Sequence, residues 1–298
     1  MEATSSVQLQ RLEGARIPAH FAVIPDGNRR WAWERGVPTI EGHRQGFEAA
    51  RRLARFCRRA GIHTVTMWAF STENWKRSPE EVTALFALYE SWILDLLPEA
   101  VEEEVRVVHI GRRDGPPKGM EAETARAGYP EGMPPSLLAA IDKIQDETAG
   151  FDRNVISLAI NYGGADELHR AVERLVARAR TTGADPASLD LRDFLDTTGQ
   201  PHPNPDLVWR TSGEYRSSGF LPLQAAYAEL VFTTKYCPDV DLIRKTVVRT
   251  GAFQRALDVA AGHVDEALTC LDGAPEGPAR DSLERLTRLI IDRVPVLE

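Results

Sequence analysis

Apolar residues follow two patterns along the chain, namely short β-branched runs and longer stretches with helical spacing. The short runs predict buried strands, in chain order, at residues 20–25, 63–70, 105–110, 154–162, 206–210 and 229–234. Stretches in which apolar residues recur every three or four positions predict helices at 42–61, 78–104, 135–149 and 166–180. Because helices of this length between strands imply right-handed crossovers, we predict an α/β fold with a mostly parallel central sheet flanked by helices.

The helix predicted at 78–104 has the clearest start signal. Ser78 suits the N-cap, Pro79 the first helical position, and Glu80 and Glu81 place negative charge in the first turn. Its apolar residues then recur at helical spacing: Val82, Leu85, Phe86, Leu88 and Tyr89. These features together predict a long amphipathic helix.

The pattern also divides the chain. Residues 1–16 are polar and predict a flexible N-terminal segment, and 17–255 predict one α/β domain. Within that domain, the Gly- and Pro-rich stretch 111–135 has no apolar period and predicts a long surface loop. Residues 256–298 predict a helical C-terminal extension, and no internal repeat is evident.

Composition narrows the class of protein. A chain of 298 residues can bury a sizeable core. Its formal net charge of -8 opposes non-specific electrostatic binding to nucleic acid. We therefore expect no nucleic-acid partner, and any anion site has to be a local cluster of cations.

The cysteines and the apolar runs indicate a cellular location. Cys57, Cys237 and Cys270 are far apart and lack the spacing of zinc ligands, so we expect reduced thiols and no structural zinc. No stretch approaches the roughly 18 apolar residues that a membrane span requires, and the N-terminus lacks an apolar signal core. These features predict a cytoplasmic protein.

Ligands of parallel sheets bind beside the carboxyl ends of the strands, so the segments after the predicted strands hold the candidate chemistry. The first such segment is Asp26, Gly27, Asn28, Arg29 and Arg30. Glycine and asparagine permit a tight turn with converging N–H groups, and the arginines can pair with phosphate oxygens against which Asp26 can hold magnesium. The alternative is a plain Asp-Gly turn with solvated arginines.

The second segment follows the strand at 63–70. It sets a hydroxyl, an amide, an aromatic ring and a cation close together, in Ser71, Asn74, Trp75 and Arg77. Such a set can orient a polar substrate. The alternative is a capped connection in which Asn74 forms an Asx-turn and Trp75 packs in the core.

The third segment contains Arg210, Ser212, Glu214, Arg216 and Ser218. Two guanidinium groups with hydroxyls match a diphosphate, because the arginine fork pairs with two phosphate oxygens at once. The alternative is a surface ion pair between Arg210 and Glu214, which would contribute little.

Two further residues are candidates for the site only because they accompany these three segments. His43, near the start of the first crossover helix, can donate a proton or hydrogen bond to a departing phosphate. A lone histidine at a helix start is usually just exposed. Similarly, Glu229 at the start of the last strand is, taken alone, typical of a solvated edge residue.

Five segments together resemble, in the same order, the motif blocks of the cis-prenyltransferases, the undecaprenyl diphosphate synthase family. They are HFAVIPDGNRRWA, GHRQGF, AFSTENWKRSPEEV, LAINYGG and PDLVWRTSGEYRSSGFLPLQAAYAELVFT. The resemblance spans residues 18–241, and five blocks in sequence are far more specific than one. It is this resemblance, and not composition or periodicity, that indicates an isoprenoid substrate.

The resemblance implies roles for the first segment. Asp26 resembles the family's aspartate that binds magnesium and the allylic diphosphate, and it is a candidate catalytic residue. The diphosphate-binding loop corresponds to Gly27, Asn28, Arg29 and Arg30, with Trp31 directly after it. His43 resembles the histidine that assists diphosphate departure.

The resemblance also implies roles for the other two segments. Residues 71–77 resemble the stretch that positions isopentenyl diphosphate and helps its proton loss, with the candidates Ser71, Thr72, Glu73, Asn74, Trp75 and Arg77. The isopentenyl diphosphate phosphates correspond to Arg210, Arg216 and Ser218, with Glu214 beside them and Glu229 as a metal-binding glutamate.

By this resemblance the protein is expected to be a Mg²⁺-dependent enzyme that condenses isopentenyl diphosphate with an allylic diphosphate. The product would be a Z-configured polyprenyl diphosphate, with release of diphosphate.

The family folds as a single α/β domain, is usually homodimeric, and has a hydrophobic tunnel between the sheet and two helices, here 78–104 and 44–59. Candidate tunnel walls, with core packing as the alternative for each, are Phe70, Leu85, Phe86, Leu88 and Tyr89. A long lipid product implies peripheral membrane association.

Other functions could use the same residues. Irregular coupling of two dimethylallyl units, or prenyl transfer to a non-isoprenoid acceptor, would need the same cationic site. A catalytically silent partner subunit is a third alternative. Such subunits typically lose the aspartate and the DGN loop, whereas residues 26–30 are intact here.

Overall fold

The computed structural model describes residues 17–239, together with residues 269 and 280. Six strands form one sheet in the order β3-β4-β2-β1-β5-β6, and every neighbouring pair is parallel. The strands are β1 (His20–Ile24), β2 (Thr64–Ser71), β3 (Val105–Ile110), β4 (Asn154–Tyr162), β5 (Leu207–Arg210) and β6 (Glu229–Phe232). Each strand overlaps its predicted run, which confirms the α/β class.

The four helices that the spacing predicts are present: α3 (Thr39–Arg59), α4 (Pro79–Glu102), α6 (Pro135–Thr148) and α7 (Gly164–Thr182). Two short helices were not predicted, α2 (Asn28–Glu34) and α5 (Glu121–Arg126). The second lies inside 111–135, so the prediction of a loop without regular structure was wrong there. Helices of one or two turns are too short to show an apolar period.

Short 3-10 helices complete the described part of the chain, namely η1 (Thr72–Lys76), η2 (Pro186–Ser188), η3 (Leu191–Phe194) and η4 (Cys237–Asp239). The predicted helix start at Ser78 is confirmed, because its hydroxyl accepts the Glu81 N–H at 3.3 Å and Pro79 takes the first helical position. The side-chain cap satisfies one of the N–H groups that a helix start leaves without an intrahelical partner.

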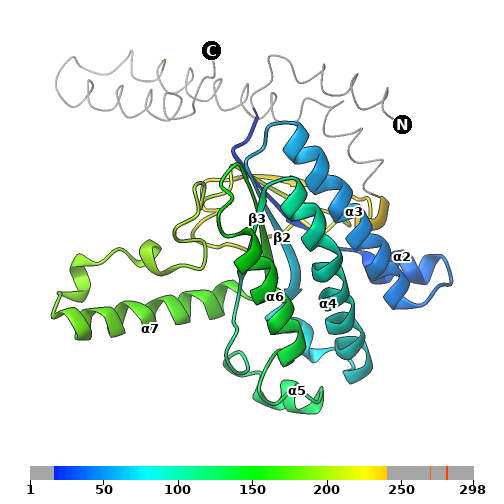
Figure 1. Cartoon of the computed structure of the whole chain (residues 1–298), viewed down its shortest axis with the longest axis horizontal. Coiled ribbons are helices and arrows are strands. Elements are labelled where there is room, and N and C mark those ends of the chain that lie inside the picture. Colours follow the sequence, from blue (N-terminus) through cyan, green and yellow to red (C-terminus); the bar gives the residue numbers. More distant parts are fainter. Residues whose placement is uncertain (1–16, 240–268, 270–279, 281–298) are drawn as a thin grey trace. The chain divides into compact units, whose positions relative to one another are not determined.

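Helices α3, α4 and α6 lie along the sheet (Figure 1), and a large apolar core fills the space beneath them. Fully buried side chains of α4 and α6, such as Phe86, Ile93 and Ile141, pack there against Val107 of β3 and Leu158 of β4. Burying apolar surface in this layer supplies the main driving force for folding.

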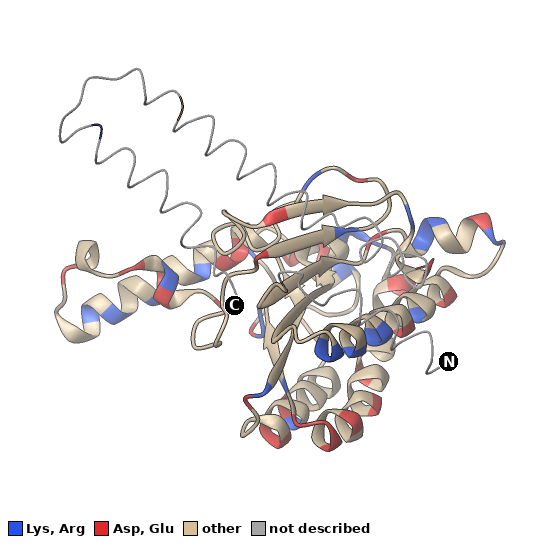
Figure 2. Ribbon diagram, turned by 90° about the horizontal axis from the view of Figure 1, so that it is seen from above, with Lys and Arg blue, Asp and Glu red and all other residues tan. Residues whose placement is uncertain are grey.

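A second apolar cluster lies on strands β1, β4 and β5, where Ala22, Tyr162 and Val208 pack with Phe220 and Leu221. These last two residues belong to the irregular segment between β5 and β6, which therefore covers part of the sheet. Helix α7 extends away from the sheet in both views, and the ribbon colours of Figure 2 show acidic and basic residues mixed along it.

Contacts group Pro18–Asp241 as one compact unit. The predicted flexible segment 1–16 and helical extension 256–298 lie outside the described residues, as does the end of the predicted domain at 255. Cys57 and Cys237 are buried and free, and Cys270 is not described. Within the described ranges, none of the helices combines the length and apolar character needed to cross a membrane.

The buried histidine of β1 makes stability depend on pH. His20 is 0% exposed, contacts the Thr66 hydroxyl at 2.7 Å through Nε2, and burial lowers its pKa to about 4. Between about pH 6.5 and 4, His20 therefore binds a proton in the unfolded chain but stays neutral in the folded chain. We expect the free energy of unfolding to fall between pH 6.5 and 4, by at most about 3 kcal/mol from this group.

Urea unfolding at a series of pH values checks this expectation. The variant His20→Gln keeps a polar side chain but cannot titrate, so its unfolding free energy should fall less steeply over the same pH range. A slope equal to that of the wild type would show that His20 is not responsible.

Candidate functional site

A cavity of about 860 Å³ opens at the carboxyl ends of β1, β2 and β5. Most of the residues predicted for the site line it, and they come from all three strand-end segments and from α3. They are Asp26, Gly27, Asn28, Arg29, Arg30, His43, Ser71, Thr72, Glu73, Asn74, Arg77, Arg210 and Ser218. The structure thus brings together side chains that lie far apart in the sequence.

The contact between Asp26 and Arg210 joins the first and third segments. β1 and β5 are neighbours in which Ile24 pairs with Arg210, so the segments that follow them meet. Arg210 is only 6% exposed, and its two terminal nitrogens donate to Asp26 Oδ2 at 2.9 Å and to Ser218 Oγ at 2.7 Å. The second Asp26 oxygen, Oδ1, accepts the Gly27 N–H at 2.7 Å.

Gly27 permits the turn from β1 into α2. Its φ of +95° is strained for a residue with a side chain, and a Cβ atom there would lie 2.6 Å from the Tyr236 ring and 2.9 Å from Ser212. The turn then leads directly into α2, whose first turn carries Asn28, Arg29 and Arg30.

Glu214 bridges two arginines beside this junction. Its carboxylate lies 3.3 Å from Arg30 and 2.6 Å from Arg216, and Arg30 also donates to the Ser212 hydroxyl. The alternative ion pair between Arg210 and Glu214 is not formed, because the Arg210 guanidinium pairs with Asp26 instead. Glu214 contacts the cavity residue Arg30, and Arg216 pairs with Glu214, but neither Glu214 nor Arg216 lines the cavity.

Hydrogen bonds of its own side chains hold the segment after β2 in place. Asn74 Oδ1 accepts the Ser71 N–H at 3.0 Å, which belongs to a capping box at the start of η1. The connection is therefore capped, as the alternative interpretation describes, but the cap is not the Asx-turn that it names. Both residues still line the cavity. Trp75 is 0% exposed and donates to Asn161 Oδ1 at 2.8 Å, so its ring belongs to the core.

Trp31 also lies off the cavity. Its indole N–H donates to Asp239 Oδ1 at 3.0 Å, and Arg35 lies over its ring. Trp33, two residues further on, is 82% exposed and lines the cavity. The structure therefore places Trp33, which was not predicted, on the cavity in place of Trp31, because α2 points successive side chains in different directions.

His43 and Glu81 form a further cluster with two arginines. One oxygen of Glu81, Oε1, lies 3.1 Å from Arg77 Nη1, 3.5 Å from His43 Nε2 and 3.7 Å from Arg29 Nε. Burial lowers the pKa of His43, although Glu81 acts in the opposite direction. Burial acts to raise the pKa of Glu81, but His43 and the two arginines together hold that pKa below its ordinary value.

The sequence indicated Glu81 only as an acid at a helix start. The signal that could have found its second role is its spacing of four residues from Arg77, which suits an ion pair. The contacts with Arg29 and His43 depend on how α2, α3 and α4 pack, and no local pattern predicts them.

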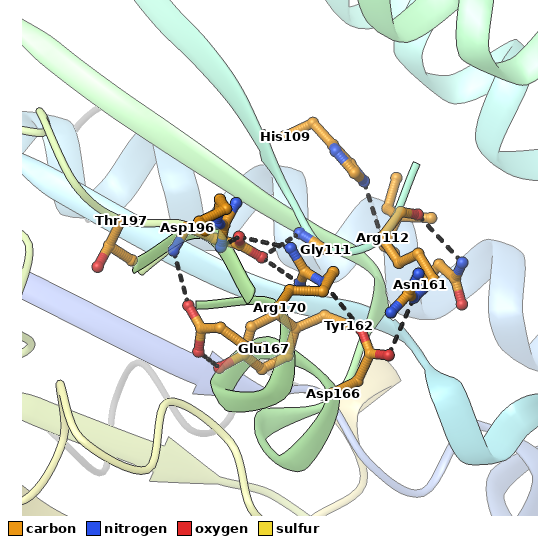
Figure 3. Close-up of polar contacts among 12 residues, drawn as sticks. His109, Gly111, Arg112, Asn161, Tyr162, Asp166, Glu167, Arg170, Asp196 and Thr197 are labelled. Atoms are coloured by element: carbon orange, nitrogen blue, oxygen red, sulfur yellow. Dashed lines mark hydrogen bonds and ion pairs between the residues drawn. The ribbon is translucent and has the colours of Figure 1, made fainter. Parts of the chain in front are cut away.

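A buried polar network supports the site at the start of α7 (Figure 3). Arg170 binds both oxygens of Asp196, at 2.7 and 2.6 Å, and also Asp166, which lines the cavity. Tyr162 donates to Glu167 at 2.5 Å and accepts the Leu221 N–H at 3.2 Å. Burial raises the pKa of Glu167. The network thus ties α7 to the segment that carries Ser218.

The inner part of the cavity is apolar. Side chains from α3, α4, β2 and β4 line it, among them Phe47, Ala50, Met67, Tyr89, Trp92 and Leu158. Of the candidate tunnel walls, Tyr89 lines the cavity, whereas Phe70, Leu85 and Phe86 are buried in the core, as their alternative interpretation proposes.

The predicted metal ligands do not meet within one chain. Asp26 follows the carboxyl end of β1, whereas Glu229 begins β6 opposite Leu207, at the other end of the sheet. The described residues contain no group of three or more His, Cys, Asp or Glu side chains arranged to hold a metal. Asp26 alone, with its carboxylate on the cavity, fits an ion that is held mainly by substrate phosphates, as magnesium commonly is.

Comparisons with known proteins show which family the chain is similar to. A sequence profile of the family described as "Putative undecaprenyl diphosphate synthase" matches residues 24–128 and 120–250. An isoprenyl transferase of Agrobacterium fabrum is 39% identical over 228 residues, which cover 76% of this chain and 85% of the relative. An isoprenyl transferase of Aquifex aeolicus is 37% identical over 227 residues, which cover 75% of this chain and 87% of the relative.

A solved structure is similar as well. Lavandulyl diphosphate synthase from Lavandula x intermedia, in complex with dimethylallyl diphosphate, matches with a TM-score of 0.68 and 28% sequence identity. The match covers 79% of this chain and 95% of that chain.

The buried Arg210 junction predicts how the site binds anions. In Arg210→Lys the single ammonium group cannot bind Asp26 and a ligand oxygen with the same fork, so affinity for inorganic pyrophosphate should fall by about tenfold or more. Isothermal titration calorimetry measures this affinity. Arg44→Lys is the control, because Arg44 is exposed and pairs with Glu41 away from the cavity. Equal losses in both variants would contradict the role of Arg210.

Proposed function

Because the chain belongs to the undecaprenyl diphosphate synthase family of isoprenyl transferases, we propose that it condenses isopentenyl diphosphate with an allylic diphosphate. The reaction would release diphosphate and form a Z-configured polyprenyl diphosphate. The observation that carries the proposal is the Asp26–Arg210 junction, which joins two cationic segments at the mouth of a cavity with an apolar interior.

The polar end of the cavity suits diphosphate groups. Arg29, Arg30, Arg77 and Arg210 line it in a protein whose net charge is -8, so the positive charge is local. Guanidinium groups held in place before the reaction can stabilise negative charge as it develops on a departing diphosphate, without reorganising. His43 lies beside two of these arginines and can donate a hydrogen bond to the same group.

The apolar end suits a hydrocarbon chain. Phe47 and Ala50 of α3 face the same space as Met67 of β2 and Trp92 of α4, which supports a tunnel between the sheet and these two helices. Burying a prenyl chain there would contribute about 0.8 kcal/mol for each methylene group removed from water.

Asp26 is the residue that would hold magnesium. A bound ion would supply positive charge to the leaving diphosphate. Asp26 is fixed for this role by Arg210 and by the Gly27 N–H. Glu229 could join it only from a second copy of the chain, because within one chain they lie at opposite ends of the sheet.

A homodimer is part of the proposal. β6 is an edge strand of the described sheet, and exposed apolar side chains gather on and beside it: Tyr215, Tyr227 and Leu230. A paired copy would cover them. The cytoplasmic location and the peripheral association of a long product with membranes stay predictions.

Coupling of two dimethylallyl units is the second candidate function. The observation that favours it is the similar solved structure, a lavandulyl diphosphate synthase bound to dimethylallyl diphosphate. The same cationic site would serve this reaction, so the two functions differ in the second substrate.

A product assay distinguishes these functions. With radiolabelled isopentenyl diphosphate and dimethylallyl, geranyl or farnesyl diphosphate as primer, we expect label in a prenyl diphosphate whose new double bond is Z by NMR. Product from dimethylallyl diphosphate alone, with no isopentenyl incorporation from any primer, would replace the leading proposal by the second candidate.

The role of Asp26 predicts the effect of its removal. Asp26→Asn keeps the size of the side chain but removes the charge that would hold magnesium, so kcat should fall about 100- to 1000-fold. Circular dichroism and thermal unfolding should show a folded protein. The control, Asp142→Asn, changes an exposed aspartate paired with Arg113 and should keep normal turnover. Near-normal turnover of Asp26→Asn would count against the metal role.

A further inference from the structure

A single oxygen of Glu81 lies close to three side chains that are cationic or become cationic when protonated. They come from different elements: Arg29 from α2, His43 from α3 and Arg77 from the segment before α4. All three line the cavity, whereas Glu81 does not. Its carboxylate therefore lies behind the groups that would meet a substrate.

The usual reason for an acid at this position does not explain these contacts. A glutamate in the first turn stabilises a helix through the helix dipole, and Glu80 has the same advantage. Glu80 is exposed and makes none of the contacts with Arg29, His43 or Arg77. Glu81 has only 16% of its side chain exposed, and it interacts with side chains across three elements.

The three contacts differ in strength. Arg29 has 60% of its side chain exposed and lies 3.7 Å away, whereas His43 has 8% exposed and lies 3.5 Å away. Arg77 is closest, at 3.1 Å. A diphosphate carries more negative charge than one carboxylate and binds guanidinium groups through two oxygens, so it can compete with Glu81 for the arginines. The His43 side chain is far less exposed than that of Arg29, so its contact with Glu81 is the one that we expect to persist when a diphosphate binds.

We propose that Glu81 is a positioning residue that holds Arg29, Arg77 and His43 at the diphosphate end of the cavity. When the substrate binds, its diphosphate takes over the two guanidinium groups from Glu81, and Glu81 keeps its contact with His43. This inference rests on the proposed function, since it deepens the role of the same site.

The exchange changes the charge around His43. The charged groups that face the imidazole are Glu81 of α4, Arg77 before α4 and Arg29 of α2. β2 contributes no ionisable side chain, and the Cys237 thiol of η4 is directed to the Gly46 carbonyl at 3.7 Å. Before binding, two positive groups oppose one carboxylate. When a diphosphate neutralises the arginines, Glu81 is no longer opposed, and a protonated His43 that can donate to the leaving diphosphate is favoured.

NMR titration of the histidine ring protons tests this inference without any turnover. His43 is assigned with His43→Asn, and the ligand is inorganic pyrophosphate. In Glu81→Gln the pKa of His43 should fall by about one unit relative to the wild type, because the carboxylate that favours the imidazolium is gone. Glu80→Gln is the matched control and should leave the pKa of His43 unchanged. Pyrophosphate should raise the pKa of His43 less in Glu81→Gln than in the wild type or in Glu80→Gln.

Binding and kinetics give the second measurement. Glu81→Gln should bind pyrophosphate at least as tightly as the wild type, because a competitor for two arginines is removed. Its kcat should fall about tenfold or more, within the range of general acid-base contributions. A purely structural role would instead weaken binding and lower the melting temperature together. Glu80→Gln should match the wild type in both properties.

The outcomes separate this inference from the proposed function. If the wild type incorporates no isopentenyl diphosphate but the pKa of His43 depends on Glu81 as expected, the function fails and the positioning role stands. If the enzyme is active but His43 titrates identically in Glu81→Gln and wild type, the positioning role is overturned. Weaker pyrophosphate binding by Glu81→Gln would also overturn the exchange.

Discussion

The ion pair between Asp26 and Arg210 is the contact on which the rest of the site depends. The two residues are separated by 184 positions in the chain, and they meet because β1 and β5 lie side by side with their carboxyl ends at the same edge. Arg210 is almost completely buried, so its charge has to be compensated by nearby partners. Asp26 and the Ser218 hydroxyl supply this compensation and fix the guanidinium group at the cavity.

Carboxylates also keep the other cations in place. Glu81 holds Arg29 and Arg77, and Glu214 holds Arg30 and Arg216. Several arginines around one cavity would repel one another without such counter-charges. The same pairs keep the guanidinium groups oriented before a ligand arrives, which reduces the reorganisation that ligand binding requires. An acidic protein can in this way present a local site for anions.

The buried network at the start of α7 also supports this arrangement (Figure 3). Tyr162 and Glu167 bind the segment around Leu221, which continues from Ser218, while Asp166 lies on the cavity itself. Because Glu167 is buried, the pKa of its carboxyl group is raised, and its hydrogen bonds with Tyr162 and Gln224 keep it from being a buried polar group without partners. The network therefore helps to fix the segment that carries Ser218, a hydrogen-bond partner of Arg210.

Local sequence patterns were enough to predict the strands, the long helices and the candidate segments after β1, β2 and β5. Periods of two and 3.6 residues, caps and turn residues are local signals, and the motif blocks indicated the family. Four findings came from the packing of the folded chain: Trp75 lies in the core, Trp33 lines the cavity, Glu81 joins α2, α3 and α4, and Glu229 lies at the far end of the sheet from Asp26. Such relations depend on the packing of elements that are distant in the chain, and a local pattern of residues carries no information about them.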